Sequence, residues 1–87
     1  MISEEVLTLL EELSQQCDAA PWTALIEGRD FDSGDSFIKT GEGVTRGEDI
    51  YVTRDSGPAS TAYLELIAAA RTYLPELIAE VREARRS

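Results

Sequence analysis

The 87-residue sequence has no histidine, only one cysteine and no long apolar run. Without histidine the commonest general base and metal ligand is missing, which excludes a Ser/His/Asp triad and a histidine-rich metal site. The single thiol, Cys17, excludes an internal disulfide and CxxC chemistry, and we expect it to be a packing residue on a helix. No apolar run approaches the ~20 residues that span a bilayer, and Met1 to Glu5 lack the features of a signal peptide. A cytoplasmic protein is therefore expected, with no membrane partner.

Basic residues are also few, 8 against 17 acidic ones, and the formal charge is −9. Direct binding to nucleic acid is disfavoured, because neutralising phosphates needs clustered lysine and arginine. Residues 1–55 hold 13 acids and 4 bases, whereas residues 56–87 hold 4 of each. This imbalance predicts an electronegative face suited to a basic protein partner. The alternative is that the charge only keeps a small protein soluble.

The length fits one small domain, residues 1–87, with helices at both ends. Ser3 can cap a helix, and apolar residues recur at helical spacing up to Cys17, so we expect a helix from Glu4 to Cys17. A second helical stripe extends from Ala59 to Ala70.

Pro75 then raises a choice between one kinked helix and two separate helices. A proline in a helix interior clashes with the carbonyl four residues before it, here Arg71, at a cost of about 3 kcal/mol. A new helix capped by Thr72 avoids this cost, because Pro75 then lies in its first turn. We therefore expect two C-terminal helices, with Leu66 and Leu77 buried.

The middle of the chain has the composition of short strands and turns. All six glycines lie between positions 28 and 57, and β-forming residues concentrate in Thr23–Glu27, Phe37–Thr40 and Ile50–Thr53. The expected fold class is α+β, a three-stranded antiparallel meander with an N-terminal helix and two C-terminal helices in the order α, β, β, β, α, α.

No pattern in the sequence indicates catalysis, a cofactor or a metal ion. The segment from Asp30 to Asp35 has the acids of a calcium loop, but glycine stands at the fifth position, where a ligand is needed. Adjacent acids such as Glu11 and Glu12 diverge on a helix. We expect no catalytic, cofactor or metal residues and no enzymatic activity.

The candidate partner-binding residues lie in two segments rich in turn-forming residues, 28–36 and 41–49. Phe31 stands between two acids, has no expected place in the core and is a candidate anchor for a partner. With the acids of both segments, the expected partner-binding set is Asp30, Phe31, Asp32, Asp35, Glu42, Glu48 and Asp49.

Two segments carry a resemblance to a known group. The sequence Asp-Ala-Ala-Pro-Trp follows the first helix at residues 18–22, and residues 69–78 read Ala-Ala-Arg-Thr-Tyr-Leu-Pro-Glu-Leu-Ile. Together they resemble small, largely uncharacterised bacterial and phage proteins with an Ala-Thr-Pro-Gly-Pro-Trp turn and a C-terminal Ala-Ala-Arg-Thr-x-x-Pro-x-Leu-Leu segment. The match covers about a third of the chain, and the first signature is shortened to Ala-Pro-Trp. The resemblance implies bacterial or phage origin and structural roles for Trp22, Arg71 and Pro75, but no catalytic residue.

Two functions remain open at this point. The first is a small acidic interaction protein, most concretely an immunity or inhibitor protein that masks a basic protein such as a nuclease toxin. The second is a homo-oligomeric structural or accessory protein, for example a homodimer, whose exposed strand edges pair.

Overall fold

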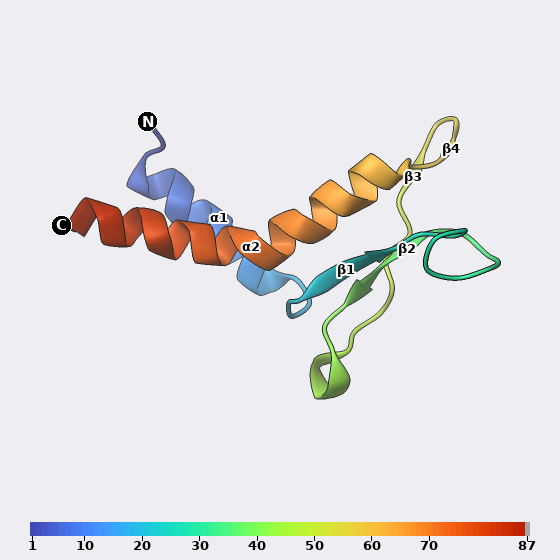
Figure 1. Cartoon of the computed structure of the whole chain (residues 1–87). Coiled ribbons are helices and arrows are strands. Elements are labelled where there is room, and N and C mark those ends of the chain that lie inside the picture. The colour runs from blue at the N-terminus through green and yellow to red at the C-terminus, as the bar shows by residue number, and fades with distance from the viewer. Residues whose placement is uncertain (87) are drawn as a thin grey trace.

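The computed structural model describes residues 1–86 and contains two α-helices and two small antiparallel sheets (Figure 1). In Figure 1, α1 lies beside the C-terminal half of α2, and β1 and β2 lie below the bend in α2. The elements in chain order are α1 (Glu4–Gln16), β1 (Trp22–Leu25), β2 (Phe37–Thr40), the 3₁₀ turn η1 (Gly43–Thr45), β3 (Thr53–Arg54), β4 (Gly57–Pro58) and α2 (Thr61–Arg86).

The N-terminal helix agrees with the sequence prediction to within one residue. The Ser3 hydroxyl accepts a hydrogen bond from the amide of Val6 at 3.2 Å, and two acids occupy the first turn. Cys17 follows the helix as its C-cap and is exposed, so its expected role as a packing residue is wrong.

The expected break before Pro75 is wrong. α2 is a single helix of 26 residues with Pro75 inside it, and it bends near its middle (Figure 1), as helices do at an internal proline. The Thr72 hydroxyl accepts from the Trp22 amide at 2.9 Å and lies 2.8 Å from the carbonyl oxygen of Ala68 and 3.1 Å from that of Trp22. Thr72 therefore joins α2 to β1 instead of capping a new helix, and this tertiary contact helps to offset the cost of the proline.

The expected three-stranded meander is also wrong. β1 pairs with β2 in the predicted antiparallel sense, with Trp22 opposite Thr40 and Leu25 opposite Phe37. The backbone of Ile50 pairs with β2 only at a single bridge to Ile38, with two hydrogen bonds of 2.9 Å.

The chain leaves β2 after Ile50 because the next residues pair elsewhere. The carbonyl of Val52 accepts from the amide of Ala59 at 2.8 Å, and between them β3 and β4 form a separate two-residue hairpin. The observed order is therefore one helix, four short strands in two sheets, and one long helix.

The apolar core has two parts, both built on α2. One cluster joins the sheet to the N-terminal half of the helix and consists of Ala24, Ile26, Ile38, Leu64 and Ala68. The other lies between the helices, where Leu7 and Ile78 are buried. Leu66 and Leu77 are 68% and 55% exposed, so the prediction that they are buried is wrong. Leu66 lies two positions after the buried Leu64, and residues two apart do not share a helix face.

The turn between α1 and β1 joins the two parts. The indole Nε1 of Trp22 donates to the carbonyl of Asp18 at 3.1 Å, and Nε of Arg71 donates to the same oxygen at 3.2 Å. The ring of Trp22 also packs against the first core cluster. Through these contacts Trp22 and Arg71 stabilise the turn between α1 and β1. The family resemblance itself stays a prediction.

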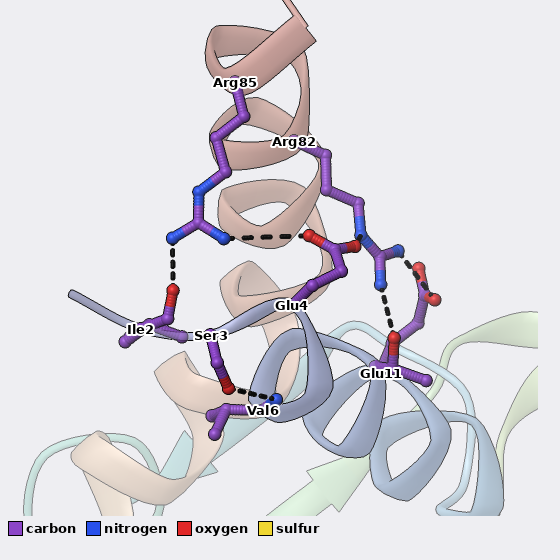
Figure 2. A network of polar contacts seen from close by, with 8 residues as sticks. Ile2, Ser3, Glu4, Val6, Glu11, Arg82 and Arg85 are labelled. Atoms are coloured by element: carbon purple, nitrogen blue, oxygen red, sulfur yellow. Dashed lines mark hydrogen bonds and ion pairs between the residues drawn. The ribbon is translucent and has the colours of Figure 1, made fainter.

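Two arginines near the end of α2 hold α1 in place (Figure 2). Arg82 donates to Glu4 at 2.7 Å, to Glu11 at 2.9 Å and to the Thr8 hydroxyl at 3.0 Å. Arg85 donates to the carbonyl of Ile2 and lies 3.7 Å from Glu4. Hydrogen bonds first with Glu11 and then with Glu4 raise the pKa of Arg82. The residues of α1 in these contacts are Glu4, Thr8 and Glu11 and those of α2 lie in its last turns, so the two arginines fix the N-terminal part of α1 against the end of α2.

Candidate functional site

The structure divides the seven predicted partner-binding residues between the two ends of the β1–β2 hairpin. Asp30, Phe31, Asp32 and Asp35 lie in the loop that follows Leu25 and precedes Phe37, which we call loop 26–36. Glu42, Glu48 and Asp49 lie beyond Thr40, in loop 41–49, which contains η1. Four strand residues, about 13 Å of backbone, separate the two loops, and Figure 1 shows them at opposite ends of the hairpin. The structure therefore places the seven residues in two separate loops, one at each end of the hairpin.

Loop 26–36 is fixed from within by Asp30. The Oδ2 atom of Asp30 accepts from the backbone amide of Ile26 at 2.7 Å and from Nε of Arg29 at 3.1 Å. The hydrogen bond with Arg29, helped by the one from Ile26, lowers the pKa of Asp30. Arg29 also pairs with Glu65 of α2 at 2.9 Å, which connects the loop to the helix. Asp30 therefore organises the loop, and its carboxylate already has partners within the chain.

Phe31 is half-buried and belongs to a row of aromatic rings. Its ring centroid lies 5.7 Å from that of Phe37, which lies 5.5 Å from that of Tyr51. The backbone carbonyl of Phe31 also accepts from the amide of Gly28 at 2.8 Å. Phe31 thus packs on the hairpin, and Tyr51, at 58% exposed, is the more accessible ring of the row.

Among the predicted binding residues of this loop, Asp32 and Asp35 are acids that keep their charge uncompensated. Both side chains are exposed, and neither carboxylate forms a hydrogen bond or ion pair with any of residues 1–86. Gly34, between them, has a φ of +104°, a backbone conformation that other residues rarely adopt. The loop therefore presents the free carboxylates of Asp32 and Asp35, and that of Glu27, on a backbone that Asp30 and Gly34 hold in shape.

Loop 41–49 has less free charge than its composition suggests. Arg46 pairs with Asp49 and also donates to the carbonyl of Gly47 at 2.6 Å. Glu42 and Glu48 are exposed, and the carbonyl of Glu48 accepts from the Thr40 hydroxyl at 2.9 Å. Of this group, Glu42 and Glu48 remain as candidate binding residues.

Arginines that were not among the predicted site residues neutralise part of the acidic surplus. Arg29 and Arg46 pair with acids one and three positions away, a local signal visible in the sequence. The pairing of Arg82 with Glu4 and Glu11 spans more than 70 positions and had no such signal. These pairs reduce the negative potential of α1 and of both loops.

Searches for a metal site, a membrane-spanning helix and known relatives gave no further indication of function. Among residues 1–86 no group of three or more His, Cys, Asp or Glu side chains is placed to hold a metal ion, and no helix in the same range is long and apolar enough to cross a membrane. Comparisons with protein-family models, curated proteins and solved structures found no match to the chain.

The pKa of Asp30 predicts a specific dependence of stability on pH. Because the folded-state pKa lies below the ordinary value of about 3.9, the Asp30 carboxylate stabilises the fold above that value, and the contribution is lost as pH falls through the folded-state pKa. In urea unfolding, Asp30→Asn should therefore be less stable than the wild type at pH 7. The difference in the free energy of unfolding between the two proteins should shrink below about pH 4.

Asp32→Asn is the matched control, since it removes an unpaired carboxylate from the same loop. At pH 7 it should lower the free energy of unfolding by less than Asp30→Asn does, because Asp32 forms no hydrogen bond or ion pair with residues 1–86. If the difference in the free energy of unfolding between the wild type and Asp30→Asn stays constant from neutral to strongly acidic pH, the Asp30 carboxylate does not stabilise the loop.

Proposed function

We propose that this chain is a small acidic interaction protein that binds a basic protein through loop 26–36. The observation that carries the proposal is the exposure of Asp32 and Asp35 as unpaired carboxylates on a loop held by Asp30. A loop that is already ordered loses little conformational entropy on binding. Uncompensated charges attract a partner of opposite sign and orient its approach.

The most concrete partner is a cationic enzyme such as a nuclease toxin, with this chain as its immunity or inhibitor protein. A nuclease holds phosphates with clustered lysine and arginine, and exposed carboxylates complement the same surface. The exposed, free thiol of Cys17 suits a reducing compartment, so we assign this activity to the cytoplasm.

An oligomer built by pairing of strand edges has less support. β1 and β2 are four residues long, and the outer edge of β2 is partly occupied by the bridge from Ile50. β3 and β4 have two residues each. Such short edges offer few backbone hydrogen bonds to another copy.

Affinity capture with charge-matched variants tests the proposal. The bait proteins are the wild type, an Asp32→Lys/Asp35→Lys double variant, and a control that makes the same charge change at two exposed acids of α2, Glu76→Lys/Glu80→Lys. From lysate of the native cell, the wild type and the control should retain a basic protein that the loop variant loses. Equal loss from both double variants assigns the binding to net charge and overturns the role of the loop.

A further inference from the structure

The two helices expose apolar residues along one shared side. On α1, Val6, Leu9 and Leu13 are 41%, 51% and 48% exposed, although they belong to the apolar stripe that marks this segment as a helix. The residues of α1 that are fully buried are Leu7 and Ser14, which face α2. The stripe of α1 is thus only partly covered by the packing of the two helices.

The apolar stripe of α2 is also only partly covered. Its apolar positions 67, 70, 74, 77, 81 and 84 alternate spacings of three and four, the repeat of a helix that packs along another helix. Ala70 is exposed, Leu74 is half-buried and Leu77 is 55% exposed. We call the five residues Val6, Leu13, Ala70, Leu74 and Leu77 the helix face; Leu9 is left out because it lines a different hollow, with Glu5 and Glu12.

A groove shows that the two stripes meet. Leu13 and Cys17 of the first segment and Ala70 and Leu74 of α2 line one hollow of about 270 Å³. The one charged residue in its lining is Arg71, whose Nε already donates to the carbonyl of Asp18. Although the chain has a net charge of −9, no acid lines this groove.

The total surface is larger than a compact monomer of this mass exposes. The accessible surface is 6142 Å², whereas a monomeric protein of this mass is expected to expose about 5,100 Å². The excess of roughly 1,000 Å² is close to the ~800 Å² that each partner buries in an interface of standard size. The radius of gyration, 15.2 Å, also exceeds the ~12 Å expected for a chain of this length.

We propose that the helix face is the interface between two copies of this chain. Two copies supply four helices, and stripes of the same repeat enclose a second apolar core between them. Association buries apolar surface that the single chain leaves exposed. Helices make this interface, so it differs from the strand-edge oligomer and does not depend on the proposed binding of a basic protein.

Sedimentation equilibrium is the direct test. The wild type should change from 9.6 kDa to about 19 kDa as its concentration rises. Leu13→Glu and Leu77→Glu replace exposed residues of the face and should weaken association by roughly 30-fold or more while helical circular dichroism is retained. Val44→Glu is the control, because Val44 is fully exposed on η1 and adds the same charge away from the helices.

The effect of salt distinguishes the proposed dimer from the proposed binding of a basic protein. Each copy has a net charge of −9, so added salt should strengthen the dimer, whereas it should weaken attraction to a basic protein. Labelling of Cys17 by a bulky maleimide provides a second readout that needs no variant. It should slow as the wild type becomes more concentrated, since the thiol lines the groove.

Several results overturn the dimer. They are a wild type that stays monomeric up to about 1 mM, a labelling rate independent of concentration, equal association by Leu13→Glu and Val44→Glu, and a monomer that floats with phosphatidylcholine vesicles. The last result assigns the face to a lipid surface.

Discussion

Leu64→Ala should lower the free energy of unfolding by about 2 to 5 kcal/mol, a large part of the stability of a small domain. Leu64 is 1% exposed and packs in the cluster that joins the sheet to α2, so its truncation leaves a cavity there. Urea denaturation monitored by circular dichroism measures the change.

Leu66→Ala is the matched control, since it is the same substitution two positions along the same helix. Leu66 is 68% exposed, and its truncation should change the free energy of unfolding by no more than about 0.5 kcal/mol. Equal losses at the two positions contradict the orientation of α2 on the sheet.

Gly41→Ala should be the most damaging of the glycine substitutions. Gly41 has a φ of +68°, and a Cβ atom there lies 2.2 Å from the carbonyl oxygen of Thr45. The positive φ alone costs an alanine about 1 to 2 kcal/mol, and relieving the clash requires the backbone of η1 to move.

Gly43→Ala isolates the contribution of the clash. Gly43 also has a positive φ, +54°, but nothing lies within 4 Å of the added Cβ atom. Thermal melting should therefore show a clearly larger loss for Gly41→Ala than for Gly43→Ala. Equal losses of thermal stability show that only the backbone conformation matters at both positions. They contradict the close approach of Gly41 to Thr45 in loop 41–49.

The elements that could be predicted from the sequence are those decided by nearby residues. The Ser3 cap and the helical stripe predict α1, and the β-forming run at Phe37–Thr40 predicts β2 with the observed bounds. The continuity of α2 could not be predicted this way, because Thr72 has its partner 50 positions away in Trp22. Similarly, Ile50–Thr53 has the composition of a strand. The backbone hydrogen bond from Ala59 to Val52 pairs this segment with a later part of the chain, so it does not form a third strand beside β2.

The candidate site was predicted in part for the same reason. Composition places the acids in exposed turns, and the structure has all six of them exposed. Composition does not show that a four-residue hairpin separates the two loops, or that Arg29 joins Asp30 to Glu65 of α2. Of the acids predicted in loop 26–36, Asp32 and Asp35 are therefore the ones that carry the proposed binding.

The association rate constant of the captured basic partner, measured by stopped-flow at increasing sodium chloride, tests the central claim most directly. Attraction between opposite charges is screened beyond about 8 Å at physiological ionic strength, so the wild-type rate should fall by roughly tenfold or more between low and high salt. The rate for Asp32→Lys/Asp35→Lys should already be low at low salt, while Glu76→Lys/Glu80→Lys should follow the wild type. A wild-type rate that does not change with salt, or a loop variant that associates as fast as the wild type, contradicts binding through loop 26–36.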